Sequence, residues 1–175
     1  MADSTLVNDQ AWMGQALQLA ELGQGRVEPN PMVGCLLINQ GKLIGKGYHE
    51  RFGGPHAECE AVSAAIRAGL KNRLRGTTAY VTLEPCCHHG KTPPCTDLLI
   101  EIGVSRVVIA MRDPFPAVAG QGIQQLQAAG IEVEVGTCSQ AAEELNAPYM
   151  KRVLSGRPWV IAKWAMSLDG RIATH

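Results

Sequence analysis

Apolar residues near the start of the chain recur at every third or fourth position, which is the spacing of one face of an α-helix. They are Met13, Ala16, Leu17 and Ala20. Asn8 can cap this helix at its start, and Gly23 directly follows its expected end at about Leu22. The pattern therefore predicts a first helix over residues 8–22.

Further along the chain, short apolar runs bounded by turn residues alternate with segments of helical spacing. The runs predict strands at 32–38, 43–49, 78–83, 105–111 and 131–136. Helical spacing covers 56–69, 92–102, 122–130 and 139–156. Thr92 can cap the second of these helices. A hairpin followed by alternating helices and strands predicts a three-layer α/β/α fold, with a mixed sheet of about five strands and helices on both faces.

The C-terminal stretch RPWVIAKWAMSLDGRIATH, residues 157–175, begins as another strand. No later element follows to pair with it. Two interpretations stay open: the stretch docks on the preceding domain, or it is the first piece of a second domain that is cut short.

Length and charge narrow the class of protein. The 175 residues suit one domain with a sizeable core, or one domain plus a fragment. Lys plus Arg and Asp plus Glu number 16 each, which argues against a broad nucleic-acid-binding surface. The first ten residues lack the features of a signal peptide, and no apolar run approaches the roughly 18 residues of a membrane span. We therefore expect a cytoplasmic protein that binds neither nucleic acid nor membrane.

Cysteine and histidine are concentrated in EPCCHHGKTPPC, residues 84–95. In a reducing compartment such clusters are more often metal ligands than disulfides. Cys86 follows the strand at 78–83, and Cys95 and His56 each lie in the first turn of a helix, where the thiolate form is favoured. We expect these three residues to meet at the carboxyl edge of the sheet. They predict a site for one Zn²⁺ per chain, with the fourth position open to water.

Glu58 lies two residues after His56, at the start of the same helix. From there it can move a proton between an activated water and a leaving amine. H-x-E followed by P-C is typical of zinc nucleobase deaminases, in which the glutamate is the acid/base and not a ligand. The second half of the pattern differs, because eight residues separate Cys86 from Cys95 instead of two.

Other ligand sets are open at this point. His88 or His89 could close a structural site with four protein ligands, although Glu58 would then have no role. Cys87 is not expected to share a metal with Cys86, because adjacent side chains diverge. The remaining cysteines are expected to pack in the core or to be exposed, and no role is assigned to Cys35, Cys59 or Cys138.

HAE at 56–58 and EPCCHHGKTPPC at 84–95 closely resemble the deaminase domain of the bifunctional riboflavin-biosynthesis deaminase/reductase family, within the cytidine-deaminase-like superfamily. Four other stretches also resemble this family: PNPMVG at 29–34, GYH at 47–49, DPFPAVAGQG at 113–122 and KWAMSLDGRIA at 163–173. The eight-residue spacing that ends in TPPC is specific to this branch.

The resemblance implies a reaction and a domain division. The reaction is hydrolytic loss of the 2-amino group from 2,5-diamino-6-ribosylamino-4(3H)-pyrimidinone 5′-phosphate, which gives 5-amino-6-(5-phosphoribosylamino)uracil and ammonia. Residues 1–155 would be the deaminase domain, and 156–175 a linker and the first strand of a truncated reductase domain. NADPH would serve only the missing reductase domain. We also expect a homo-oligomer.

The resemblance also implies four substrate contacts. Asn30 would hold the pyrimidine edge, His49 the base or ribose, Lys91 the phosphate and Asp113 the ribose hydroxyls. Without the family, each has a simpler reading: Asn30 and Asp113 as turn residues, His49 as an exposed strand-end histidine, Lys91 as a solvated lysine. Where the family pattern is DPNP, this chain has Phe115, which either points away from the substrate or lowers its affinity.

Two other functions fit parts of this pattern. One is a deaminase of the same fold that acts on guanine or on a tRNA adenosine, which predicts the short cysteine spacing and, for tRNA, a basic face. The other is a zinc-stabilised binding module without turnover, which predicts that Glu58→Gln is harmless and that a fourth protein ligand closes the metal site.

Overall fold

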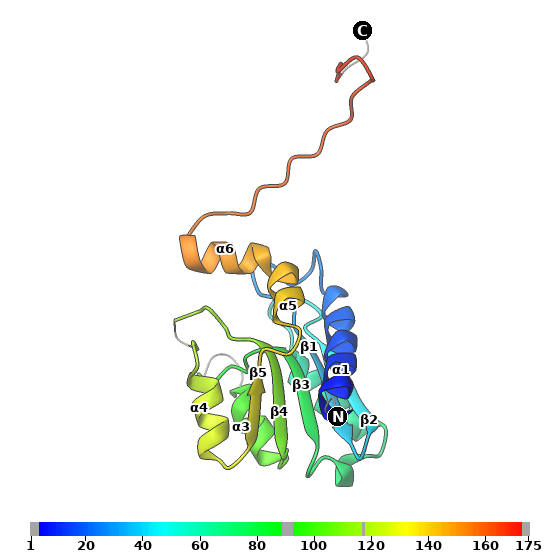
Figure 1. The fold of residues 1–175 in the computed structure, drawn as a ribbon, viewed down its shortest axis with the longest axis vertical. Coiled ribbons are helices and arrows are strands. Elements are labelled where there is room, and N and C mark those ends of the chain that lie inside the picture. Colours follow the sequence, from blue (N-terminus) through cyan, green and yellow to red (C-terminus); the bar gives the residue numbers. More distant parts are fainter. Residues whose placement is uncertain (1–3, 89–92, 117, 173–175) are drawn as a thin grey trace.

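The computed structural model describes residues 4–88, 93–116 and 118–172 (Figure 1). The helices are α1 (Ser4–Glu21), α2 (Ala57–Arg67), the short 3₁₀ helix η1 (Lys71–Arg73), α3 (Cys95–Glu101), α4 (Gln121–Ala128), α5 (Ser139–Leu145) and α6 (Ala147–Ser155). The strands are β1 (Gly34–Asn39), β2 (Lys42–Tyr48), β3 (Thr78–Leu83), β4 (Arg106–Met111) and β5 (Glu132–Val135). Apart from η1 and the break between α5 and α6, their order is the predicted one.

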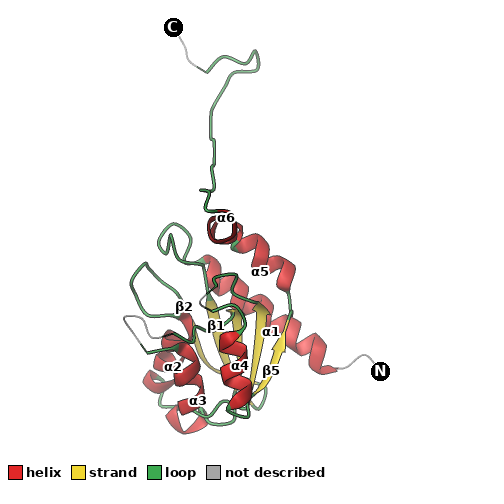
Figure 2. Cartoon of the chain, turned by 90° about the vertical axis from the view of Figure 1, so that its left-hand side faces the viewer, coloured by secondary structure: helices red, strands yellow, loops and turns green. Residues whose placement is uncertain are grey.

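The five strands form one mixed sheet in the order β2-β1-β3-β4-β5. β1 is antiparallel to both β2 and β3, whereas β3, β4 and β5 run parallel. Helices α2, α3 and α4 cover one face, and α1 and α5 cover the other (Figure 2). The predicted three-layer arrangement is confirmed.

Strand β1 is buried on both faces, which is why its sequence is an unbroken apolar run. Cys35 and Leu37 pack in the cluster beneath α2, and Leu36 and Ile38 pack in the cluster beneath α1. Cys35 is fully buried, so its predicted place in the core is confirmed.

A glycine allows β2 to lie directly against α2. A Cβ atom at Gly47 would come within 2.4 Å of the Ala61 backbone nitrogen, closer than atoms can approach. This close packing puts the end of β2, and therefore His49, beside the beginning of α2.

Two helix predictions differ from the structure. α1 begins at Ser4, so Asn8 lies inside the helix and is not its cap. Asparagine costs little within a helix, so the helix continues through it. The expected single helix over 139–156 is divided at Asn146, whose side-chain amide bonds both the nitrogen and the oxygen of Met32 at 2.8 and 2.9 Å. Thr92 lies outside the described residues.

Beyond α6 the chain is extended and highly exposed, and residues 157–166 form no strand. No strand forms in this described segment, because no sheet edge lies alongside it (Figures 1 and 2), and its expected role as the first strand of a further domain stays a prediction. Its one aromatic contact in the described residues is local: the Lys151 ammonium on α6 lies 5.5 Å from the centre of the Trp159 ring. None of the described helices is both long and apolar enough to cross a membrane.

Candidate metal centre and substrate pocket

The three predicted metal ligands converge. One ligand atom from each of His56, Cys86 and Cys95 lies within 4.8 Å of the others. The Nδ1 atom of His56 is 3.5 Å from Cys86 Sγ and 3.4 Å from Cys95 Sγ. A tetrahedral zinc with ordinary bond lengths separates nitrogen and sulfur ligands by roughly 3.5 Å. The donor set and its spacing therefore fit zinc.

Local backbone geometry holds these ligands in place. Cys86 follows β3, His56 immediately precedes α2, and Cys95 is the first residue of α3. The Cys95 nitrogen donates to Cys86 Sγ at 3.3 Å, and the Thr96 nitrogen donates to the Cys86 carbonyl at 3.1 Å. The start of α3 is thereby fastened to the end of β3, and the two sulfurs have a fixed separation.

The electrostatics favour the zinc-binding thiolate form at Cys86, whereas hydrogen bonds with Cys59 and Cys86 raise the pKa of Cys95. Hydrogen bonds from the Cys95 thiol and from His56 lower the pKa of Cys86 to about 4, although burial opposes the shift. The Cys86 thiolate in turn raises the pKa of His56 to about 9. A metal ion would replace the protons that this cluster shares, so its affinity depends on pH.

Glu58 lies in the first turn of α2 and is buried, with 3% of its surface exposed. Burial raises the pKa of its carboxyl group, and the Cys86 thiolate raises it further. Glu58 lines the same pocket as His56 and Cys86. A buried carboxyl group with a raised pKa beside a metal site is suited to accept a proton and return it.

Cys59, to which the sequence assigned no role, is half-buried and lies one turn after His56. A hydrogen bond with Cys95 lowers the pKa of its thiol. His56 is the N-cap of α2 and Cys59 lies in the first turn of this helix, three residues later, and this short spacing is the signal that sequence reasoning overlooked.

A cavity of about 510 Å³ opens beside the metal ligands. Two of the predicted substrate residues, Asn30 and His49, form part of its wall. The Asn30 amide nitrogen lies 3.2 Å from His49 Nε2, and His49 Nδ1 lies 2.9 Å from the Pro55 carbonyl oxygen. The Pro55 carbonyl can accept only from a protonated Nδ1, so in the neutral ring Nε2 is the acceptor and the Asn30 amide nitrogen is its donor. The side-chain oxygen of Asn30 therefore remains available to a ligand.

His49 is buried, not an exposed strand-end residue. Burial lowers the pKa of its ring, which favours the neutral tautomer. Its ring meets that of His56 edge-on, with centroids 5.7 Å apart. The close packing of β2 on α2 thus connects the substrate wall to the metal ligands.

Asp113 lines the pocket from the loop after β4. Its Oδ1 atom accepts from the Phe115 nitrogen at 2.9 Å and from the Tyr149 hydroxyl at 2.8 Å. Burial raises the pKa of the Asp113 carboxyl group. Phe115 is among the residues that line the pocket, and its ring lies 6.5 Å from that of His88.

Glu84 also lines the pocket, although the sequence analysis did not select it. Its buried carboxylate accepts from four backbone nitrogens, those of Asp113, Gly120, Gly122 and Ile123. One side chain therefore holds both the loop after β4 and the start of α4. A glutamate directly after a buried strand was the available signal.

Helix α6 lies across the end of the sheet where the parallel strands finish (Figure 1). Tyr149, Arg152 and Val153 on this helix line the pocket. Sequence reasoning did not select them, because nothing near them in the chain points to a site.

Some predicted residues fall outside this cluster. Cys87 and His88 are not among the three candidate ligands, although His88 lines the pocket. Lys91, predicted to bind phosphate, and His89, the other candidate fourth ligand, lie outside the described residues.

Comparison with known proteins agrees with this geometry. The sequence model of a family described as the cytidine and deoxycytidylate deaminase zinc-binding region matches residues 6–111. The riboflavin biosynthesis protein RibD of Escherichia coli (strain K12) is 48% identical over 167 residues, which are 95% of this chain and 44% of that protein. RibD of Aquifex aeolicus (strain VF5) is also 48% identical, over 95% of this chain and 45% of that protein. The chain thus spans less than half the length of these curated relatives.

Solved structures show the same relationship. A Thermotoga maritima diaminohydroxyphosphoribosylaminopyrimidine deaminase/5-amino-6-(5-phosphoribosylamino)uracil reductase superimposes with a TM-score of 0.90 at 46% identity, over 98% of this chain and 48% of that chain. Acinetobacter baumannii RibD gives a TM-score of 0.87 at 48% identity, over 96% of this chain and 46% of that chain. The resemblance and the fold class predicted from the sequence are confirmed.

Proposed function

This chain belongs to the cytidine and deoxycytidylate deaminase zinc-binding family, and from that premise we propose that it hydrolytically deaminates 2,5-diamino-6-ribosylamino-4(3H)-pyrimidinone 5′-phosphate. The products would be 5-amino-6-(5-phosphoribosylamino)uracil and ammonia, in riboflavin biosynthesis. The observation that carries the proposal is the meeting of His56, Cys86 and Cys95 beside Glu58 in one pocket, in a chain 46–48% identical to deaminase/reductase proteins.

His56, Cys86 and Cys95 would hold one zinc ion, whose chemistry is that of a Lewis acid that lowers the pKa of the attacking water. Glu58 would accept the proton from this water as C2 is attacked. It would then deliver this proton to the ring nitrogen. The second proton of the water, by now on the hydroxyl group at C2, would pass through Glu58 to the amino group as the C2–N bond breaks, so that ammonia leaves and C2 keeps a carbonyl oxygen. Its burial supports this role, because a raised pKa makes the carboxylate a stronger base towards the proton of the water.

The rest of the pocket would orient the ribotide. The free oxygen of Asn30 would accept from the pyrimidine edge, and its amide is held by His49. Asp113, fixed by Tyr149, would accept from ribose hydroxyls. We keep Lys91 as a proposed phosphate ligand. The Phe115 side chain can offer only apolar contact.

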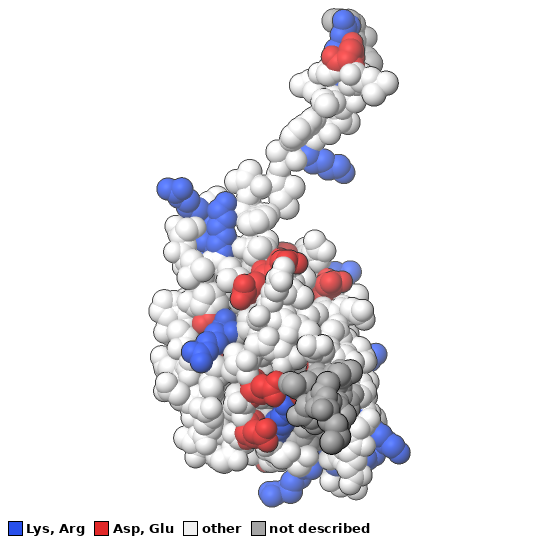
Figure 3. Space-filling view, in the orientation of Figure 1, with Lys and Arg blue, Asp and Glu red and all other residues white. Residues whose placement is uncertain are grey.

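We further propose that residues 1–155 are the deaminase domain and that 156–175 are a linker and first strand of a reductase domain. The exposed, extended tail supports this division. NADPH would belong to the reductase part, and we propose no hydride transfer by residues 1–175. A cytoplasmic homo-oligomer that binds no nucleic acid remains the proposed setting. On the face in Figure 3, acidic and basic side chains are interspersed over the folded domain.

The decisive experiment measures ammonia release from the ribotide and zinc content on the same purified sample. About one zinc per chain with turnover supports the proposal. Zinc without turnover favours the zinc-stabilised binding module. Absence of zinc from a folded sample would refute the ligand assignment. Activity on guanine or on a tRNA adenosine, without activity on the ribotide, would show that the proposed substrate is wrong.

A further inference from the structure

The pocket has an uneven charge distribution. Among its described lining residues the acids are Glu58, Glu84 and Asp113, and Arg152 is the one lysine or arginine. Glu84 accepts from four backbone nitrogens, and the Oδ1 atom of Asp113 accepts from Tyr149 and Phe115. In the described part of the chain, Arg152 forms no ion pair with any of these three acids.

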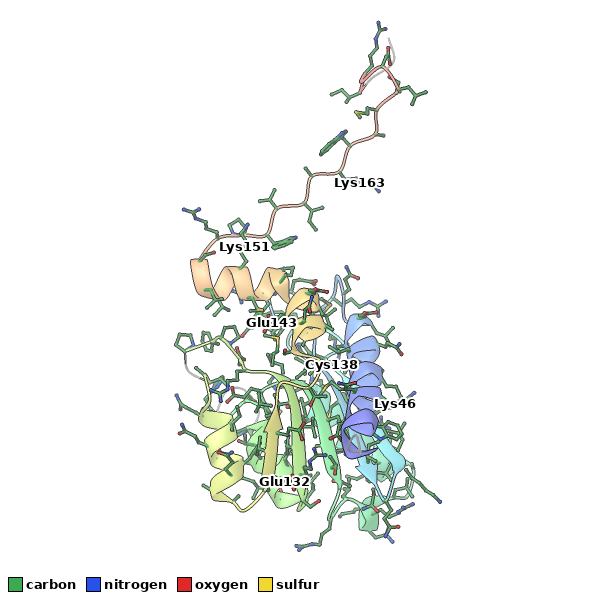
Figure 4. All side chains as sticks on the ribbon, viewed as in Figure 1. Lys46, Glu132, Cys138, Glu143, Lys151 and Lys163 are labelled. Atoms are coloured by element: carbon green, nitrogen blue, oxygen red, sulfur yellow. The ribbon has the colours of Figure 1, made fainter. Side chains whose placement is uncertain are left out.

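Helix α6 presents one face to the cavity. Tyr149, Arg152 and Val153 are spaced three and four residues apart, so they share a side of the helix, and all three line the pocket. The neighbouring Lys151 instead directs its ammonium at the Trp159 ring, outside the pocket lining (Figure 4). Two basic residues that are adjacent in sequence therefore have different surroundings.

The guanidinium of Arg152 bridges two parts of the pocket rim. Its Nη2 atom donates to the Pro29 carbonyl at 3.0 Å, and the next two residues, Asn30 and Pro31, line the pocket. A guanidinium carries several N–H donors in one plane, so this bond orients the group and leaves donors for a ligand.

We propose that Arg152 binds the phosphate group of the substrate and makes the enzyme selective for the ribotide over its dephosphorylated riboside. This inference rests on the proposed deaminase function and adds a phosphate ligand from α6. A planar guanidinium matches two phosphate oxygens at once, and such charge-assisted pairs are among the stronger hydrogen bonds. Arg152 is a specificity-determining residue and takes no part in the proton transfers of Glu58.

The test compares kcat/KM for the ribotide and the riboside in the 175-residue chain and its variants. Arg152→Gln is expected to lower kcat/KM for the ribotide roughly 10- to 100-fold, chiefly through KM, and to leave the riboside within about threefold. Arg152→Lys should recover part of the loss, since it restores charge but not the planar fork. Lys151→Gln is the matched control and should change kcat/KM for neither substrate. Zinc content and thermal unfolding verify that each variant is folded.

Several outcomes would overturn the proposal. Equal losses on both substrates would mean that Arg152 only ties α6 to the Pro29 loop. No loss on either would mean that phosphate is bound elsewhere, and Lys91→Gln, measured in parallel, would show whether Lys91 binds it. If the wild type deaminates neither compound, the proposed function fails, and calorimetry with ribose 5-phosphate tests the phosphate site separately. Binding by the wild type that is lost in Arg152→Gln would support the phosphate site. No binding by the wild type would refute it.

Discussion

The two sides of the pocket are built in different ways. The metal side takes its three candidate ligands and Glu58 from residues 56–95, at the beginnings of two helices and the end of one strand. The substrate side takes residues from four separate places in the chain, represented by Asn30, His49, Asp113 and Arg152. The first side depends on local helix and strand ends, whereas the second depends on contacts between distant segments. Substitutions should therefore separate chemistry from substrate placement.

The largest expected effect is on the metal side. Glu58→Gln should lower kcat by roughly 10²–10⁴-fold, because the amide cannot accept and return the proton. Zinc content and the folded state should be unchanged, since Glu58 is not among the candidate ligands. Ammonia release and metal analysis on the same sample check this, and undiminished turnover would show that another group moves the proton.

On the substrate side, the long-range contact to test is the pair of hydrogen bonds between the Asn146 side chain and the Met32 backbone. Asn146→Ala removes two bonds to Met32 and leaves the Met32 backbone nitrogen and oxygen unpaired. We expect a loss of about 2–4 kcal/mol in the free energy of unfolding and a raised KM, because α6 begins at this point. Denaturant unfolding and steady-state kinetics measure both.

The matched control for this change is Asn72→Ala, because Asn72 is exposed. It should alter the free energy of unfolding by less than about 0.5 kcal/mol. If Asn146→Ala lost zinc as readily as activity, the two sides of the pocket would not be separable in this way.

A smaller effect is expected at Tyr149. Tyr149→Phe removes the hydroxyl that donates to Asp113 at 2.8 Å and keeps the ring in the pocket wall. Since one net hydrogen bond contributes about 1 kcal/mol, kcat/KM for the ribotide should fall roughly 3- to 10-fold. Zinc content should not change. A larger fall in kcat than in kcat/KM would assign Tyr149 to the chemical step.

The smallest expected effect is pH-dependent. Burial raises the pKa of Asp113 above its ordinary 3.8, so the folded chain binds a proton at this group more readily than the unfolded chain. Its charge therefore costs stability at neutral pH, and that cost disappears as pH falls through the folded pKa towards 3.8. Asp113→Asn keeps the Oδ1 acceptor for Phe115 and Tyr149.

We expect Asp113→Asn to be more stable than the wild type at pH 7, by less than about 1 kcal/mol, with the difference closing at acid pH. Thermal unfolding at several pH values measures this. A difference that widened towards acid pH would mean that the carboxylate is stabilised in the fold.

The sequence alone determined the layers of the fold and the candidate metal ligands. Apolar runs at 32–38 and 78–83 and the helical spacing at 56–69 are local patterns, and each became the expected element. The sequence was enough to predict four site residues, namely His56, Glu58, Cys86 and Cys95. Helix starts and strand ends of an α/β sheet meet at one edge, so the positions of these residues in the chain imply that they lie close together.

Only the tertiary structure decided the outer wall of the pocket. Tyr149 and Arg152 lie on a helix whose own sequence gives no sign of a site, and Asn146 connects that helix to Met32, 114 positions earlier. The role of the Glu84 carboxylate and the burial of His49 likewise depend on contacts with backbone segments that are distant in the sequence. Hydrophobic periodicity records which face of an element is buried but not which element covers it, because that choice depends on packing between segments far apart in the chain.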